Sequence, residues 1–275
     1  MRSLIMQSLS DLKYYLRKNS SVERAQTSKR FFKTGKGEYG EGDEFLGLAV
    51  PDCRKIAKRF INIELDDLKK HLESKYHEER LVALLILVEQ FKKTETNGKR
   101  KIYDFYMENK ECANNWDLVD LTADKIVGEW LFDKDMENSV DCVALRQNSP
   151  DRDLGTKSNK TNQNLCKSIL HDLARSDNLW DRRIAIVATF AFIKKRRFDE
   201  TLNISEMLLK DKHDLIHKAC GWMLREVGKR DIAVLERFLK KNYKNMPRTM
   251  LRYAIERFDY KTRKAYLEGY IDNRA

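Results

Sequence analysis

The stretch HEERLVALLILVEQF, residues 77–91, opens with charged residues and continues with apolar ones at the three- and four-residue spacing of a helix. Two later stretches follow the same plan: NLWDRRIAIVATFAF at 178–192 and DLIHKACGWMLREVG at 214–228. Each carries a basic residue near its start. Such self-similarity, on the scale of a helix pair, is typical of HEAT-like helical-repeat proteins. We therefore expect an all-α, HEAT-like helical-repeat solenoid, with an irregular all-helical domain as the alternative.

Turn-forming residues are few, because the 275 residues include only three prolines and eleven glycines. Strand-rich folds need many turns, so this shortage favours helices joined by short loops. We expect residues 1–275 to form a single repeat domain with two breaks in its helical pattern. Residues 33–47 hold five of the glycines and predict a loop. Residues 134–164 are polar, include Pro150 and Gly155, and predict a flexible surface insertion.

The charge of the chain indicates a class of partner. Lys and Arg number 54 against 43 Asp and Glu, which gives a net charge of +11 and a pI of about 9.3. A basic excess of this size favours a polyanionic partner, most often nucleic acid and less often an acidic membrane surface. The alternative is a soluble basic protein without such a partner.

Cysteine usage and hydropathy indicate the compartment. The longest apolar run, LVALLILV at 81–88, is too short to cross a bilayer, and the N-terminal residues become polar too soon for a signal peptide. We expect a cytoplasmic protein, or a nuclear one in a eukaryote, with no membrane partner. The cysteines are odd in number and widely spaced, as expected of reduced thiols rather than disulfides or a zinc site. They are Cys53, Cys112, Cys142, Cys166 and Cys220.

The stretch NNWDLVD at 114–120 places a tryptophan and two carboxylates within five positions. In a helix, Trp116 and Asp120 lie four residues apart on one face, whereas Asp117 points elsewhere. Asn114 or Asn115 is a suitable N-cap, and Asp117 then lies in the first turn, where its charge complements the helix dipole. This structural explanation accounts for Asp117. It does not account for Asp120, at a position where a core-facing stripe normally has an apolar residue.

Two downstream helices repeat the pairing of a tryptophan with charged residues. Trp180 and Arg183 are three positions apart, and Trp222 lies four positions after Lys218 and three before Arg225. A single tryptophan at helical spacing is more often part of a core than of a ligand site. Equivalent positions of successive repeats align in a solenoid, so these residues are expected to converge on one concave surface.

That surface is also predicted to be basic. Lysines and arginines surround each of these helices and continue into the C-terminal ones, where they suit contacts with a phosphate backbone. Taken one at a time, each is equally compatible with a solvated helix face. The run KKRR at 194–197 is a weak nuclear-localisation signal. The basic residues are Arg182, Arg183, Lys194, Lys195, Arg196, Arg197, Lys212, His213, His217, Lys218, Arg248, Arg252, Lys261, Arg263 and Lys264.

Tryptophans and one carboxylate in a basic groove suit a specific chemistry. Aromatic faces attract a cationic, electron-poor base through cation–π interactions. Breaking the bond from that base to its sugar develops positive charge on the deoxyribose, which an ionised aspartate stabilises while it positions a water molecule. An alkylated cationic purine is already a good leaving group, so this chemistry needs little acid catalysis.

At these residues the sequence resembles the AlkD-type DNA alkylation-repair glycosylases, which are HEAT-like repeat proteins that excise cationic N3- and N7-alkylpurines. The resemblance extends over most of the chain. It includes FFKTGKGEYGEGDEFLGLAVPDCRKIAKRF at 31–60, NNWDLVD at 114–120, DNLWDRR at 177–183 and HKACGWMLRE at 217–226.

The resemblance implies roles for individual residues. It implies that Asp120 is the catalytic aspartate, that Trp116 and Trp222 flank the damaged base, and that Arg183 contacts the DNA backbone. It also implies catalysis without flipping of the base into a deep pocket. Around these residues we place further backbone contacts at Arg182, Trp180, Lys218, Arg225, Arg248 and Arg252.

The chain departs from the family in two places. Better-known members have a tyrosine in the helix before the FLG segment, where this chain has Phe31 and Phe32. The aromatic face is kept and the hydroxyl is lost, and we expect Phe32 to contact the lesion. The 134–164 insertion follows the Asp120 helix, and it either contacts DNA or extends from the surface of the solenoid without contacting DNA.

The leading hypothesis is a monofunctional DNA glycosylase that hydrolyses the N-glycosidic bond of cationic N3- and N7-alkylated purines in duplex DNA, without metal or organic cofactor. It would act as a monomer, associated with the nucleoid through DNA. The first alternative is a HEAT-like module that binds damaged or structured DNA without catalysis, in which Asp120 is a cap or polar contact. The second is a protein-binding scaffold.

Overall fold

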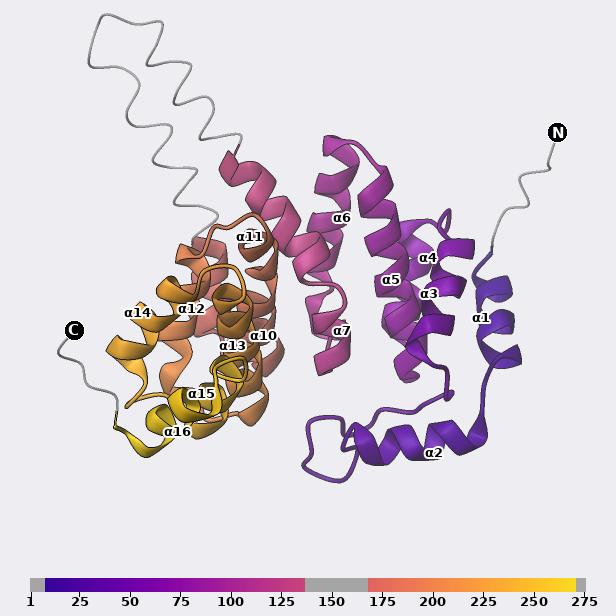
Figure 1. Ribbon diagram of the computed structural model, residues 1–275. Helices are drawn as coiled ribbons and strands as arrows, with labels where there is room; N and C mark the ends of the chain where they lie inside the picture. The colour runs from indigo at the N-terminus through magenta and orange to yellow at the C-terminus, as the bar shows by residue number, and fades with distance from the viewer. Residues whose placement is uncertain (1–7, 137–167, 271–275) are drawn as a thin grey trace, which may run out of the picture. The chain divides into compact units, whose positions relative to one another are not determined.

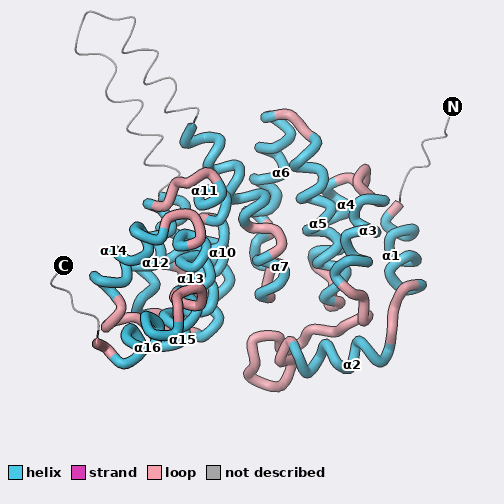
Figure 2. The backbone as a smooth tube through the Cα atoms, viewed as in Figure 1, coloured by secondary structure: helices cyan, strands magenta, loops and turns pink. Residues whose placement is uncertain are grey.

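The structure is a computed structural model that describes residues 8–136 and 168–270, and the described chain is all-helical (Figures 1 and 2). The only β-type pairing among these residues is an isolated bridge between Glu44 and Tyr76. The predicted all-α class is confirmed. No helix in this part of the chain is long and apolar enough to cross a membrane. The predicted 134–164 insertion lies outside the described residues except at 134–136, which are helical.

The chain divides into two compact units, one over residues 1–122 and the other over 123–275. The expectation of one continuous repeat domain over 1–275 stays a prediction, and each unit is described by itself below.

The N-terminal unit is built around its longest helix, α5 (His77–Lys93). Thirteen of the seventeen residues of α5 are buried, because it is apolar on nearly all sides over residues 81–88. Other helices of the unit pack against α5 and cover it from several directions. The remaining helices are α1 (Leu9–Lys18), α2 (Val22–Phe31), α3 (Val50–Arg59), α4 (Leu65–Leu72), α6 (Thr96–Glu108) and α7 (Trp116–Asp120).

The C-terminal unit is built around α13 (Asp214–Gly228), which packs against several of its neighbours. Its closest partner is α15 (Arg248–Ala254). A Cβ atom at Gly221 would lie 2.5 Å from the Met250 carbonyl oxygen, so only glycine permits this approach. The unit begins with a π-helix (Asp124–Gly128) and also contains α10 (Leu179–Ala188), α11 (Phe190–Lys194), α12 (Asp199–Met207), α14 (Ile232–Asn242) and α16 (Tyr260–Glu268).

One hydrogen-bond arrangement recurs just before α5, α10 and α13, the helices that begin in the three self-similar stretches. Before α5, the Ser74 hydroxyl accepts a hydrogen bond of 3.1 Å from the backbone N–H of Tyr76. The side chain of Arg80, six residues after Ser74, donates one of 2.7 Å to the Ser74 carbonyl. Ser74 thus forms a turn that ends at Tyr76, the N-cap of α5, and its carbonyl holds the side chain of Arg80 from the first turn of the helix.

The other two helices repeat these bonds at the same sequence spacing. The bond from the backbone N–H to the side chain is 3.1 Å before α10 and 2.8 Å before α13. The bond from the later side chain to the backbone carbonyl is 3.0 Å before α10 and 2.6 Å before α13. This shared detail supports a true internal repeat rather than an irregular packing of helices. The corresponding residues are Ser176, Asn178 and Arg182 before α10, and Asp211, His213 and His217 before α13.

Candidate active site

The short helix α7 presents the predicted catalytic residue. The side chain of Asn115 caps the helix by accepting a hydrogen bond of 2.8 Å from the backbone N–H of Trp116. Trp116 and Asp120 are both partly exposed, as expected for two residues four apart on one face. Asp117, in the first turn, is buried. The local geometry of α7 is therefore as its sequence predicts.

Two phenylalanine rings contact the Trp116 indole. The Phe32 ring stacks with the indole at a centroid distance of 5.3 Å and an interplanar angle of 17°. Phe32 also stacks with the buried Phe45 at 5.1 Å. Phe31 meets the indole edge-on at 5.8 Å and is 63% exposed. The two phenylalanines therefore differ in setting, since Phe32 supports the indole within a stack and Phe31 lies at the surface.

The chain path between α2 and α3 holds these rings in place. The backbone N–H of Ser21, the N-cap of α2, donates a 2.8 Å hydrogen bond to the Leu46 carbonyl. Gly47 has a φ of +79°, and a Cβ atom there would lie 2.1 Å from the Ser21 carbonyl oxygen. The buried Glu78 carboxylate accepts hydrogen bonds from the backbone N–H groups of Leu46, Gly47 and Leu48. The loop is therefore fixed both to α2 and to α5.

A buried ionic cluster joins this loop to α5 and α7. His77, the first residue of α5, lies with Nε2 2.9 Å from Asp117 Oδ2 and with Nδ1 3.3 Å from Asp43 Oδ2. Arg80 donates a 2.6 Å hydrogen bond to the other Asp43 oxygen, and Asn115 donates one of 3.2 Å to Asp43 Oδ2. All five residues are buried. The cap of α7 and its first turn are thus tied to the same carboxylate-rich centre.

The cluster carries two positive and two negative charges at neutral pH. Burial alone would lower the pKa of His77, but the hydrogen bond and charge of Asp117, joined by Asp43, outweigh burial and raise that pKa to about 9. Burial would likewise raise the pKa of Asp43, and the hydrogen bond from His77 and the charge of Arg80 reverse this and lower it. His77 is therefore an imidazolium that donates from both nitrogens.

Sequence reasoning did not find this cluster. The dipole of its own helix already accounts for Asp117, and nothing local in the sequence marks Asp43 or His77 as its partners. His77 lies 34 positions after Asp43 in the sequence, and Asp117 lies 40 positions after His77. The available signal is the charged run that opens the apolar stretch at 77–91, because charged groups next to a buried segment need partners.

Trp222 in the C-terminal unit has a different environment. It is partly exposed on α13, and its ring lies 5.9 Å from that of Phe190 at an angle of 50°. The Lys194 ammonium lies 4.6 Å and the Arg230 guanidinium carbon 5.6 Å from the Phe190 centroid. Both cations therefore lie over the phenylalanine that neighbours the tryptophan.

The predicted DNA contacts on α10 are largely occupied within the unit. Arg182 forms a 2.6 Å ion pair with Asp211. Arg183 is only 4% exposed and donates a hydrogen bond to the Leu215 carbonyl. Trp180 is 8% exposed. Arg182 and Arg183 thus join α10 to the start of α13, and the contact of all three residues with DNA stays a prediction.

The predicted contacts on α13 and α15 lie nearer the surface. Lys218 pairs with Asp214 at 2.7 Å, and Arg225 pairs with Glu256. Arg248 is exposed and donates a hydrogen bond to the Leu267 carbonyl, and Arg252 is exposed on α15.

Most of the KKRR run is paired with nearby acids. Lys194 lies 2.7 Å from Asp124 on the π-helix, and Lys195 lies 2.5 Å from Glu129. Arg197 lies 2.8 Å from Asp135. These pairs bind the end of α11 to the helices at 124–136, so the run contributes to packing within the unit.

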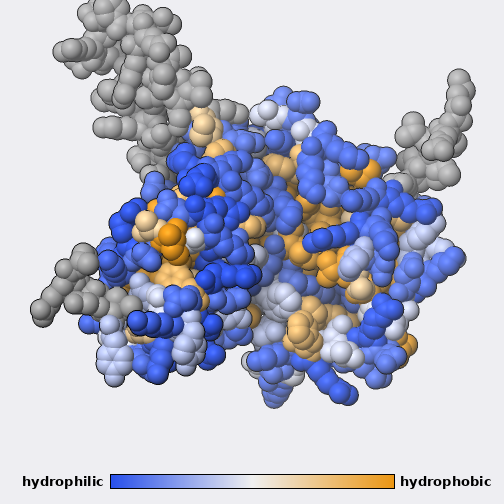
Figure 3. All heavy atoms as spheres, in the orientation of Figure 1, coloured by the Kyte–Doolittle hydropathy of each residue, from blue (hydrophilic) through white to orange (hydrophobic). Residues whose placement is uncertain are grey.

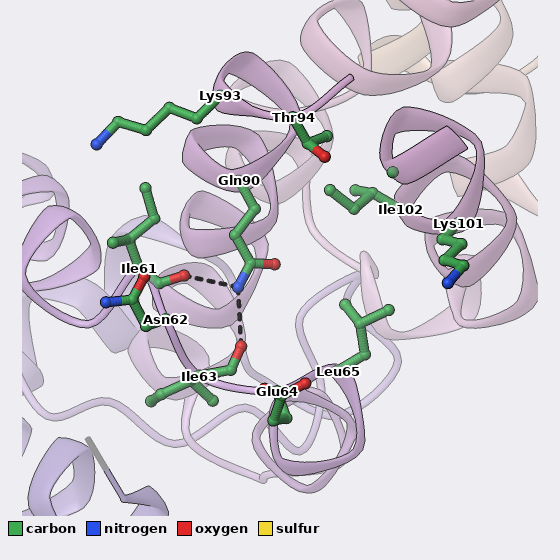
Figure 4. A pocket seen from close by; sticks show the side chains of 11 residues that line it. Ile61, Asn62, Ile63, Glu64, Leu65, Gln90, Lys93, Thr94, Lys101 and Ile102 are labelled. Atoms are coloured by element: carbon green, nitrogen blue, oxygen red, sulfur yellow. Dashed lines mark hydrogen bonds between the residues drawn. The ribbon is translucent and has the colours of Figure 1, made fainter. Parts of the chain in front are cut away.

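One surface pocket lies apart from these residues. Apolar side chains reach the surface around α5 in Figure 3, and a pocket of about 500 Å³ opens where α4, α5 and α6 meet. Figure 4 shows the Gln90 amide at its centre, where it donates hydrogen bonds to the carbonyls of Ile61 and Ile63. Both N–H donors of the amide are therefore engaged, and none of the predicted site residues lines the pocket. Across the described residues, no group of His, Cys, Asp and Glu is arranged to hold a metal ion.

Comparisons with known proteins place the chain in a family. A search of curated proteins found no match. A solved structure described as a predicted DNA alkylation repair enzyme from Enterococcus faecalis matches with a TM-score of 0.59 over 88% of this chain and 98% of that one. The identity is 15%, which shows a shared fold alone. The family model for DNA alkylation repair enzymes matches residues 12–149 and 155–258. The chain belongs to the DNA alkylation repair enzyme family.

Proposed function

We propose that the protein is an AlkD-type DNA glycosylase that hydrolyses the N-glycosidic bond of cationic N3- and N7-alkylated purines in duplex DNA. The observation that carries this proposal is the joint placement of Trp116 and Asp120 on one partly exposed face of α7. An indole ring and a carboxylate are thereby presented together at the surface. Membership in the alkylation-repair family supports DNA as the partner.

The chemistry follows from the two groups. The bond between the purine nitrogen and C1′ breaks, and its electron pair goes to the base, which leaves as a neutral purine. The positive charge that develops on the deoxyribose is stabilised by the Asp120 carboxylate. Water adds to C1′ and loses a proton to the solvent, which gives an abasic site. The base is already cationic, so the reaction needs no proton donor to the leaving group.

The aromatic residues supply affinity for the lesion. A cationic base near the face or edge of Trp116 gains cation–π attraction that a neutral purine lacks. Phe32 holds the indole from within its stack, and the exposed Phe31 extends the aromatic surface beside it. Trp222 offers a second indole, on α13 of the C-terminal unit.

Exposed cations of the C-terminal unit are assigned to the phosphate backbone. Arg252, Arg248 and Lys218 lie at or near the surface, where a phosphate replaces water or a paired acid. Arg183 and Trp180 are buried, so we assign them a supporting part in place of the backbone contact predicted from the sequence. Arg183 fixes the junction of α10 with α13.

The test is release of free methylated purine from duplex DNA treated with a methylating agent, under single-turnover conditions. Wild type should release the base, and Asp120→Asn should bind the same DNA with equal affinity and release none. Asp104→Asn, which removes a partly exposed carboxylate from α6, is the matched control and should behave as wild type. Equal release by Asp120→Asn and wild type would refute the assigned role. Salt-sensitive DNA binding without release by wild type would identify a non-catalytic module.

A further inference from the structure

The ionic cluster around His77 fixes the helix that carries the proposed catalytic residue. α7 has only five residues, too few for its own backbone hydrogen bonds to hold its orientation. Its first turn is instead fastened from outside through the Asp117 carboxylate. One Asp117 oxygen accepts the Leu118 N–H at 2.9 Å, and the other lies 2.9 Å from His77 Nε2. Both oxygens are therefore engaged, which fixes the rotation of the side chain and of the turn.

We propose that His77 is a positioning residue of the active site, which sets the orientation of the Trp116 indole and the Asp120 carboxylate by bridging Asp117 and Asp43. The inference rests on the proposed function for what Asp120 does. The placement of α7 by His77 rests on geometry alone.

His77 acts on the aromatic side of the site as well. Its ring stacks with Phe45 at a centroid distance of 4.9 Å and lies 4.7 Å from the ring of Phe32. Phe32 in turn stacks with Trp116. One side chain thus holds α7 by a hydrogen bond and the support of its indole by ring contact.

Charge balance gives the bridge its strength. Asp43 and Asp117 need two positive charges in the interior, and Arg80 supplies only one. The other ionisable groups nearby do not supply the second. Glu78 on α5 is a carboxylate bonded to three backbone N–H groups, and Cys53 on α3 is a thiol whose pKa burial raises to about 12. The imidazolium is therefore required to neutralise the cluster, and a neutral side chain would loosen the bridge.

Stability alone does not account for such an arrangement. Replacing a buried ion pair by apolar residues of similar volume is often neutral or stabilising, so a buried pair is weak evidence for a purely stabilising role. A fixed direction for the first turn of α7 is something that the bridge provides and an apolar contact does not. Small misplacements of a reacting group cost about a hundredfold in rate.

The experiment compares His77→Gln with His71→Gln. His71 is an equally buried histidine of the same unit, on α4, and neither of its ring nitrogens has a hydrogen-bond partner among the described residues. Single-turnover base release, expressed per folded molecule, should fall by about tenfold to a hundredfold in His77→Gln. The DNA dissociation constant should change by less than about threefold. His71→Gln should keep the wild-type rate. An unchanged rate in folded His77→Gln would overturn the proposal.

A double-mutant cycle tests the route through Asp117. Asp117→Asn and His77→Gln remove the same contact, so the double variant should lose no more rate than the worse single variant. Losses that multiply would mean that Asp117 and His77 act independently, which contradicts the bridge.

A measurement without substrate separates this inference from the proposed function. The side-chain indole N–H resonance of Trp116, assigned with Trp116→Phe, should shift in His77→Gln and stay in place in His71→Gln. If wild type releases no base, the proposed function fails. The indole resonance then still shows whether His77 sets the orientation of Trp116. If His77→Gln does not fold, the same resonance is followed in wild type from about pH 7 to about pH 10, as the imidazolium loses its proton. A resonance that does not move in either case would overturn the role of His77.

Discussion

The rings of Phe32 and Trp116 stack with their centroids 5.3 Å apart and their planes 17° from parallel. The indole proposed to meet a damaged base therefore rests on a phenyl ring from the end of α2. Phe31, the neighbouring residue, contacts the same indole but is mostly exposed. Two adjacent phenylalanines thus have separable parts in one site.

Alanine substitutions should separate them. Phe32→Ala removes stacking and burial and should lower the free energy of unfolding by about 1–3 kcal/mol. Phe31→Ala should change it by less than about 0.5 kcal/mol and weaken binding to alkylated DNA relative to undamaged DNA. Urea denaturation and competition binding measure the two effects. A large loss of stability in Phe31→Ala would contradict the assignment.

The two aspartates of α7 should respond differently to the same change. Asp117→Asn breaks a buried ion pair and should lower the free energy of unfolding by on the order of 3 kcal/mol. Asp120→Asn alters a partly exposed group and should leave thermal stability near that of wild type while base release is lost. Calorimetry beside single-turnover kinetics makes the comparison. Similar melting temperatures for the two variants would show that Asp117 is not held as described.

Stability should fall in alkaline solution because of His77. Its folded pKa of about 9 lies above the ordinary value of 6.5, so its contribution is complete below pH 6.5 and is lost as the pH rises through 9. The difference corresponds to on the order of 3 kcal/mol. Urea denaturation from about pH 6 to about pH 10 should show this loss in wild type, and His77→Gln should lack that part of it. Parallel curves for the two proteins would exclude a charged His77.

His71 should produce the opposite dependence. Burial lowers its pKa to about 4, and the Glu79 carboxylate, 3.8 Å away, does not reverse this. The unfolded chain therefore binds a proton that the folded chain does not, so stability falls as the pH drops from 6.5 towards 4. His71→Gln should reduce this loss of stability between pH 6.5 and pH 4. The chemical shifts of the His71 ring measure its pKa directly, and titration near 6.5 would contradict the burial argument.

Salt dependence should distinguish exposed from buried arginines in the C-terminal unit. Arg252→Ala should reduce the slope of log affinity against log salt concentration by about 1, since one phosphate contact is lost. Arg183→Ala removes a buried donor and should lower stability, with the slope unchanged for the folded protein. Fluorescence anisotropy at several salt concentrations provides both slopes. A reduced slope in Arg183→Ala would instead show that Arg183 contacts the DNA backbone directly.

The sequence by itself determined the features that depend on neighbours along the chain. Apolar spacing predicted the all-α class, and the helices that begin in the three stretches at 77–91, 178–192 and 214–228 share one hydrogen-bond arrangement just before their starts. The pattern at 114–120 predicted a helix that begins after Asn114 or Asn115 and presents two residues on one face, and the structure begins it after Asn115. These features follow from interactions over two to six positions, which are visible in sequence.

The tertiary structure decided which groups pair over long distances. The excess of lysine and arginine predicted a basic surface, but the fold occupies many of these cations with acids or carbonyls, as at Arg182 and Lys194. The bridge from Asp43 through His77 to Asp117 joins residues far apart in sequence. A buried charge must find its partner wherever the folded chain brings one, and that choice depends on the path of the backbone rather than on spacing.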